Sequence, residues 1–208
     1  MANVLLGATG SVAAVRVPAL FARLRQLGHA VKVVATKPSL YFFDPADLET
    51  GRSAVVLDED EWPGRDEGRR YRAGEPVPHI ELRRWADLFL VAPLDANTLA
   101  KLAVGLADNC LTCVWRAWDV TRPVVLAPAM NTLMWEHPIT ARHLRQLAAD
   151  ADGEATGSDP AELVVQINRL CQKLRVVAPQ SKRLACGDEG VGALAEVADI
   201  ADAVDSLL

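Results

Sequence analysis

The sequence predicts an α/β protein, with a parallel sheet covered by helices on both faces and a single domain spanning residues 1–208. Short apolar runs, several rich in β-branched residues, alternate along the chain with segments of helical periodicity. Half of the 208 residues are hydrophobic, which is enough for one domain with a substantial core. No internal repeat divides the chain, so a repeat architecture is not expected.

The chain opens as strand, helix, strand. Residues 3–7 form a short apolar strand that ends in glycine, and residues 11–27 have helical periodicity closed by Gly28. The continuous run 30–36 is typical of a strand buried on both faces. The remaining elements are expected in this order: helix 79–85, strand 88–92, helices 96–104 and 109–118, strand 123–127, helix 161–174, strand 175–178 and helix 196–207.

Two stretches lack this regularity. Residues 57–76 are charged, contain glycine and proline, and show no periodicity, which predicts a surface loop that could act as a lid. Residues 148–159 are polar and rich in Gly, Ala and Asp, so we expect a mobile connection there.

The composition disfavours several classes of protein. A net charge of −5 and a pI near 5.4 do not suit a nucleic-acid binder, which normally carries a basic face. No apolar run reaches the ~20 residues that span a bilayer, and the first residues lack an export signal, so no membrane association is expected. Four cysteines are few for a disulfide scaffold, which predicts reduced thiols and a cytoplasmic location.

The first segment that could carry chemistry is the turn Gly-Ala-Thr-Gly-Ser at 7–11, between the first strand and the first helix. Free N–H groups at such a helix start attract phosphate, and Ser11 could be both the N-cap and a phosphate ligand. Ala13 replaces the third glycine of a dinucleotide fingerprint, and the second strand ends in Thr36-Lys37 without an acid for a ribose hydroxyl. A mononucleotide phosphate therefore fits better than a dinucleotide, while an ordinary turn remains the alternative.

Two more segments follow later strands. In 92–101, either Asp95 or Asn97 could cap a helix, and Asn97 and Thr98 would lie at the ligand edge of the sheet, although a purely structural cap is also possible. In 127–138, Asn131 stands among Pro, Met and Trp, which indicates an apolar pocket with one amide that could hold a carboxylate. A turn with core-filling Met and Trp is the alternative.

Two residues have side chains suited to proton transfer. His79 starts a helix beside the proposed lid, although a lone histidine is more often structural. Cys186 begins a segment with three glycines, which predicts a loop that could fold over a ligand and present a thiol proton donor. An incidental cysteine is the alternative.

A zinc site deserves separate consideration. His79-Ile-Glu81 followed by Cys110-Leu-Thr-Cys113 imitates the zinc nucleobase deaminase pattern. Asn109 stands where that pattern has proline, and an additional strand and helix separate its two halves. The two cysteines could simply line one helix face, so we expect no metal.

Taken together, these segments resemble the homo-oligomeric flavin-containing cysteine decarboxylases. The resemblance covers nearly the whole chain and rests on GSVAA at 10–14, HIELRRWAD at 79–87, APLDANTLAK at 92–101, DNCLTCVWRAWD at 108–119, PAMNTLMWEHPIT at 128–140 and RLACGDEGVGALAEV at 183–197. It implies a Rossmann-like (flavodoxin-like) fold, bound FMN, and homotrimers, sometimes assembled into dodecamers, with active sites between neighbouring subunits.

The resemblance also implies roles for individual residues. Gly10, Ser11 and Val12 would meet the flavin phosphate region with Ser39 nearby, Asp95, Ala96, Asn97 and Thr98 fall on the flavin-binding segment, and Ala129 sits near the ring. His79 matches the active-site histidine. Asn131, with Met130 beside it, matches the ligand of the substrate carboxylate, and Cys186 matches the acid of a reductive step on a substrate clamp at 183–192.

The implied chemistry is oxidative decarboxylation of a cysteine whose α-carboxylate is free. Flavin takes hydride from the carbon bearing sulfur, CO₂ leaves beside the resulting C=S group, and an enethiolate remains. Within the family the segments are most similar to the branch of coenzyme A biosynthesis, which converts 4′-phosphopantothenoylcysteine to 4′-phosphopantetheine by returning hydride and a proton.

Two alternatives remain. Relatives in ribosomal-peptide pathways decarboxylate a C-terminal peptidyl cysteine and stop at the enethiol. Cys186 favours the coenzyme A substrate, since only the reductive half needs an acid there. The irregular 148–174 stretch and the expected lack of a fused synthetase domain favour the peptide. A regulatory flavoprotein that binds a phosphatase is less favoured, because His79, Asn131 and Cys186 are intact.

Overall fold

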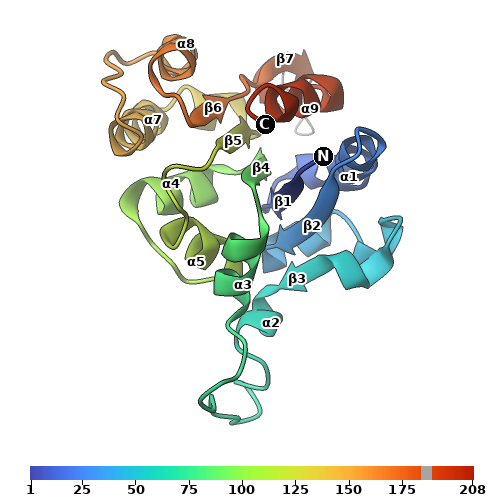
Figure 1. Ribbon diagram of the computed structural model, residues 1–208. Coiled ribbons are helices and arrows are strands. Elements are labelled where there is room, and N and C mark those ends of the chain that lie inside the picture. Colours follow the sequence, from blue (N-terminus) through green and yellow to red (C-terminus); the bar gives the residue numbers. More distant parts are fainter. Residues whose placement is uncertain (184–188) are drawn as a thin grey trace.

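The computed structural model describes residues 1–183 and 189–208 and has a six-stranded parallel sheet at its centre (Figure 1). The strand order is β3-β2-β1-β4-β5-β6, and every neighbouring pair runs parallel. The strands of this sheet are β1 Asn3–Ala8, β2 Ala30–Ala35, β3 Val55–Leu57, β4 Leu88–Leu94, β5 Val124–Pro128 and β6 Leu174–Val176.

Helices cover both faces of the sheet and form two hydrophobic cores. One core lies beneath the 3-10 helix η1 (Val12–Arg16), α1 (Val17–Gln26) and α9 (Val197–Asp205). The other lies beneath five helices, namely α3 Pro78–Trp85, α4 Ala96–Val104, α5 Cys110–Arg116, α7 Pro138–Asp150 and α8 Pro160–Leu170. Strand β4 serves both cores, because alternate side chains of a strand point to opposite faces. The predicted fold class is therefore confirmed.

The strand order creates one position at which the chain changes direction across the sheet. From β1 the chain moves outward to β2 and β3, and it then crosses to β4 on the other side of β1. Ligands of open parallel sheets bind at the carboxyl ends of strands at such a switch point. The turns that follow β1, β4 and β5 therefore define the edge where a site is expected.

Several elements differ from the expectation. Residues 57–76 are not entirely loop, because the end of β3 is followed by the one-turn helix α2 (Asp58–Glu61). α7 continues to Asp150, inside the stretch expected to be mobile, and α8 ends at Leu170 because Cys171 has extended backbone angles. The sequence analysis also missed strand β3, the whole of α7, α6 (Thr132–Trp135) and an antiparallel pair, β7 (Gln180–Arg183) and β8 (Glu189–Ala193).

Short 3-10 helices fill the connection between β2 and β3; they are η2 Lys37–Tyr41, η3 Pro45–Asp47 and η4 Gly51–Ala54.

Of the cysteines in the described part of the chain, Cys110, Cys113 and Cys171 are all free thiols. Within residues 1–183 and 189–208, no helix combines the length and the apolar character needed to cross a membrane.

Candidate active site

The turn after β1 begins the candidate site. Ser11 is the N-cap of η1, as predicted, and its Oγ accepts the N–H of Ala13 at 3.3 Å. A Cβ atom on Gly10 would lie 2.6 Å from the Cβ of Pro38 and 3.2 Å from Oδ2 of Asp95. Only glycine fits there, because the turns after β1, β2 and β4 converge on this one residue.

The turn after β4 is tied to the turn after β1 by hydrogen bonds. Thr9 donates its hydroxyl to the Pro93 carbonyl at 2.8 Å and accepts the Asp95 N–H at 2.8 Å. Oδ1 of Asp95 accepts the N–H of Thr98 at 2.7 Å and so caps α4. Asp95 is therefore the cap, while Asn97 is exposed at the same edge.

Ser39 and Val12, which are also predicted to lie near the flavin, differ in their burial. Ser39 is fully buried in η2, and its hydroxyl donates to the Thr36 carbonyl at 2.7 Å. Val12, the first residue of η1, leaves 48% of its surface exposed. Ser39 directly follows Pro38, which lies against Gly10. The roles of both residues toward a flavin stay predictions.

The turn after β5 carries Asn131. Its Oδ1 accepts the N–H of Leu133 at 2.9 Å, so Asn131 is the N-cap of α6. Ala129 is buried and bonded to the end of β4, while the Met130 N–H donates to the Gly192 carbonyl at 2.9 Å. A Cβ on Gly192, whose φ is +144°, would lie 2.2 Å from the Met130 oxygen. Strand β8 therefore packs directly on the segment that holds Asn131.

Cys186, the predicted acid of the clamp at 183–192, lies outside the described residues. The strands on either side of it, β7 and β8, pair antiparallel with Ser181 opposite Val191 and Lys182 opposite Gly190. Thus the hairpin joins the clamp segment to the turn after β5.

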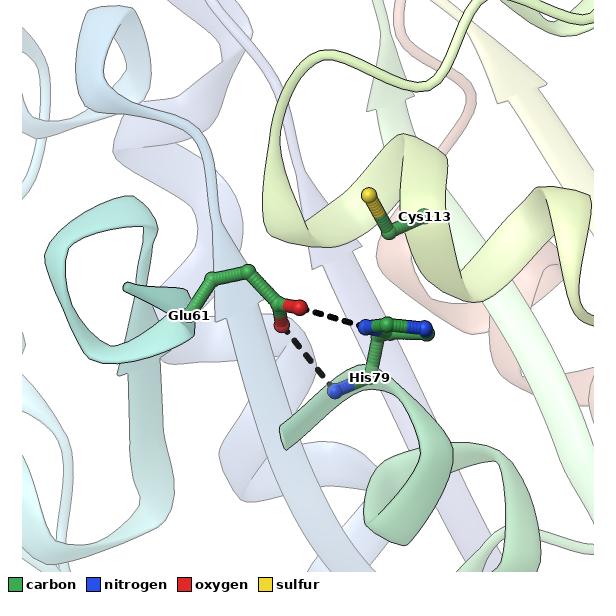
Figure 2. Close-up of side chains that lie close together, drawn as sticks. All are labelled: Glu61, His79 and Cys113. Carbon is green, nitrogen blue, oxygen red and sulfur yellow. Dashed lines mark hydrogen bonds and ion pairs between the residues drawn. The ribbon is translucent and has the colours of Figure 1, made fainter. Parts of the chain in front are cut away.

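His79 lies in the first turn of α3, which runs back toward the start of β4, so this turn faces the same sheet edge. Its Nδ1 hydrogen-bonds Oε1 of Glu61, and its backbone N–H donates to Oε2 of Glu61 at 3.0 Å (Figure 2). The Glu61 side chain is 3% exposed and the His79 side chain 23%. A buried carboxylate thus holds the imidazole in one orientation and assigns a proton to Nδ1.

Two thiols on α5 adjoin this pair. Figure 2 shows Cys113 on α5 next to the His79–Glu61 pair, and its Sγ lies within 4.8 Å of ligand atoms of both residues. Burial raises the pKa of Cys113, and the negative charge of Glu61 raises it further. Burial followed by Glu61 also raises the pKa of Cys110. Both cysteines are therefore held as thiols rather than thiolates at neutral pH.

The same residues bear on the question of a metal. Ligand atoms of Glu61, His79 and Cys113 lie within 4.8 Å of one another, close enough to share a metal ion. However, both oxygens of Glu61 already accept hydrogen bonds from His79. The arrangement therefore suits an imidazole oriented by a carboxylate better than it suits a metal site. Glu81, the acid of the deaminase-like pattern, is an exposed residue of α3 and does not belong to this cluster.

A hollow of about 570 Å³ opens beside the His79–Glu61 pair. The segment 62–77, which joins α2 to α3, forms its other wall through Trp62, Pro63, Arg65, Arg69, Arg70, Tyr71, Glu75, Pro76 and Val77. Its volume is within the range of small-molecule sites. The lid predicted at 57–76 thus corresponds to a wall of a hollow that His79 also lines.

The fold and this edge define an α/β protein with a tight glycine turn at Gly10 packed on Asp95, an imidazole–carboxylate pair at His79 and Glu61, and a capping asparagine at Asn131. Comparison with known proteins identifies the family to which this chain belongs. The model of the family described as Flavoprotein matches residues 1–208, and the chain belongs to that family.

Among curated proteins, the chain is 44% identical over 207 residues to phosphopantothenoylcysteine decarboxylase of Mus musculus, covering 99% of this chain and 87% of the mouse protein. Among solved structures, it is similar to a PPC decarboxylase mutant complexed with pantothenoylaminoethenethiol, at 44% identity and a TM-score of 0.78, covering 99% and 97% of the two chains. The FMN-binding protein AtHal3 matches at 45% identity and a TM-score of 0.74, covering 99% and 95%.

A more distant match is the FMN-dependent cysteine decarboxylase SpaF, at 27% identity and a TM-score of 0.70, covering 100% of this chain and 97% of SpaF.

Proposed function

We propose that this chain is an FMN-dependent carboxy-lyase that acts on a cysteine with a free α-carboxylate, and that its substrate is 4′-phosphopantothenoylcysteine of coenzyme A biosynthesis. The observation that carries the proposal is the buried Glu61–His79 pair, which lies at the same sheet edge as the Gly10 turn and Asn131. Membership of the Flavoprotein family and 44% identity to a phosphopantothenoylcysteine decarboxylase support it.

The residues at the switch point fit a flavin mononucleotide. The absence of a side chain at Gly10 lets backbone approach backbone, and the capped helix start at Ser11 offers N–H groups to a phosphate. We assign Gly10, Ser11 and Val12 to the phosphate end, and the α4 start from Asp95 to Thr98 to the ring end with Ala129. Ser39 would support the turn from beneath.

When bound, FMN supplies a two-electron oxidation of the carbon that bears sulfur, which places the α-carboxylate beside an electron-accepting C=S group from which CO₂ can depart. The protein must then hold the substrate and manage its protons. Glu61 keeps Nδ1 of His79 protonated, which leaves Nε2 to accept a proton from the substrate or to hydrogen-bond it.

Asn131 would hold the substrate carboxylate, with Met130 beside it. Capping fixes the side chain, since Oδ1 is bound by the helix it starts. A neutral amide can position a carboxylate without the extra charge that would stabilise it against loss as CO₂. If the reaction continues to the saturated thiol, Cys186 would supply the proton.

The alternative substrate is a C-terminal peptidyl cysteine, converted to an enethiol. The similarity to SpaF, at 27% identity, keeps this reading open. The higher identity to phosphopantothenoylcysteine decarboxylases over the same length favours the coenzyme A substrate.

We propose a homotrimer, either alone or assembled further into a dodecamer, as the working form. Leu133 and Met134, directly after Asn131, leave 76% and 54% of their surfaces exposed. Such apolar exposure beside a site fits contact with a neighbouring subunit. Light scattering of the purified protein would measure the assembly, and a stable monomer would contradict it.

The decisive experiment for the function is mass spectrometry of the products formed from both candidate substrates by flavin-loaded protein. Loss of CO₂ without loss of hydrogen from 4′-phosphopantothenoylcysteine, giving 4′-phosphopantetheine, is the expected result. A product lacking two further hydrogens, formed only from a peptide, would support the alternative. Absence of CO₂ release from both would overturn the decarboxylase assignment.

A further inference from the structure

The wall of the hollow beside His79 is unusually basic for an acidic protein. The chain carries a net charge of −5, yet the segment 62–77 contains four arginines against three acids. Three of those arginines, Arg65, Arg69 and Arg70, line the hollow. The acids that line it are Glu61 and Glu75, and Glu61 is already engaged by His79.

The three guanidinium groups are neutralised to different degrees. Arg69 pairs with Glu75, its Nη2 lying 2.7 Å from Oε1. Arg65 stacks on the Trp62 ring, with 5.2 Å from Cζ to the ring centroid, and only reaches its exposed neighbour Asp66 at 3.4 Å.

Arg70 is the least neutralised of the three. Its Nη1 donates to the carbonyls of Gly68 and Arg69, at 3.2 and 3.3 Å. Within the described part of the chain, Arg70 has no carboxylate at ion-pair distance. The hollow therefore offers at least one guanidinium whose charge no acid among residues 1–183 and 190–208 balances.

Apolar and aromatic groups complete this wall. Trp62, Pro63, Tyr71, Pro76 and Val77 line the hollow together with the arginines and the His79–Glu61 pair. A ligand that suits both parts has a reacting end near His79, an arm of mixed polarity, and an anionic group at the far end. Arginine binds phosphate by two parallel hydrogen bonds, which gives both affinity and geometric selection.

We propose that the segment 62–77 is the specificity element of the site and that Arg70, assisted by Arg65, binds the terminal phosphate monoester of the substrate. This inference rests on the proposed function and deepens it. The phosphate is the group that separates 4′-phosphopantothenoylcysteine from a peptide ending in cysteine. Arg69 holds the wall in place through Glu75, and its stem packs against Gly64.

The test compares 4′-phosphopantothenoylcysteine with pantothenoylcysteine, which lacks only the phosphate. Wild-type protein is expected to have the higher kcat/KM for the phosphorylated substrate. Arg70→Gln should lower kcat/KM for that substrate roughly 10- to 150-fold, the loss typical of a hydrogen bond to a charged group. The effect should fall on KM, because the phosphate is remote from the reacting carbon, and kcat/KM for pantothenoylcysteine should not change.

Arg72→Gln is the matched control, since Arg72 belongs to the same segment but does not line the hollow. It should leave both substrates unaffected. Calorimetry with 4′-phosphopantetheine and pantetheine gives a second readout, in which Arg70→Gln should weaken binding of the phosphorylated compound alone. Flavin content and thermal unfolding report whether each variant is folded.

The outcomes separate the two proposals. If wild-type protein uses both compounds equally well, or if Arg70→Gln lowers kcat/KM for both alike, the phosphate assignment is overturned while the decarboxylase function stands. An equal effect of Arg72→Gln would also overturn it, because the loss would then reflect charge in general. If flavin-loaded protein decarboxylates neither compound, the proposed function itself fails.

Discussion

Replacing Glu61 by glutamine tests whether the buried carboxylate acts through His79. The carboxylate accepts two hydrogen bonds from this residue, one from Nδ1 and one from the backbone N–H at 3.0 Å. An amide of the same shape has one acceptor oxygen, and its NH₂ group would face one of these donors. Whichever way it turns, one of the two bonds is lost.

The size of the effect follows from that loss and from burial. Since the Glu61 side chain is 3% exposed, water cannot replace the missing bond. A hydrogen bond to a charged group contributes about 1.5–3 kcal/mol, which corresponds to roughly 10- to 150-fold in rate. We expect Glu61→Gln to lower kcat by that factor while KM changes little, because the imidazole is misoriented in the transition state rather than absent.

The assay is the single-turnover reduction of bound flavin on mixing with substrate, together with steady-state CO₂ release. Nitrogen NMR of the imidazole would report whether Nδ1 still carries the proton. Glu81→Gln serves as control, because Glu81 lies on the same helix but is exposed and outside the cluster. A Glu61→Gln protein with normal kcat and normal flavin content would refute the positioning role.

Three further results are expected. Gly10→Ala should lower the flavin bound per chain, measured by absorbance after gel filtration, because its Cβ would lie 2.6 Å from the Cβ of Pro38; full flavin content would contradict the role assigned to Gly10. At pH 8, Cys113 should react with iodoacetamide more slowly than glutathione does, because burial and then the charge of Glu61 raise its pKa. Cys113 should react faster in Glu61→Gln than in wild-type protein. Peptide mass spectrometry would measure both rates, and a Cys113 rate equal to that of glutathione, or unchanged by the substitution, would refute the reasoning. Asn131→Asp should keep its thermal unfolding temperature, because aspartate also caps helices, yet lose turnover through repulsion of the substrate carboxylate; an active variant would exclude that carboxylate role.

The sequence predicted the central part of the fold well. Residues 88–94 form a strand that is buried at every position, and residues 30–35 form one that is buried at all positions but Ala30 and Lys32. An apolar run of this length is typical of such a central strand, which is why both could be predicted. The polar residues directly after strands, such as Asp95 and Asn131, could be anticipated because a chain leaving a parallel strand must turn and usually starts a capped helix. Identifying Asp95 rather than Asn97 as the cap required the coordinates.

Other features carried almost no local signal. Strand β3 has only the residues Val55–Leu57, too few for any periodicity. Glu61 is one of four consecutive acids at 58–61, and such runs normally face solvent. Its burial depends on His79, eighteen residues further on, which only the folded chain brings to it. The β7–β8 hairpin likewise depends on docking against Met130 rather than on its own composition.

The bonds from Glu61 to His79 join the two ends of the segment 62–77. The segment therefore leaves and re-enters the domain at two residues that are bonded to each other, and we expect this pair to tolerate changes in the length and composition of the segment. Insertions, deletions and changes of charge within the segment 62–77 are therefore expected to leave the orientation of the imidazole intact. A related decarboxylase could thus acquire a new substrate by exchange of a single peptide cassette, and grafting a foreign 62–77 onto this chain is a direct route to redesigning its preference.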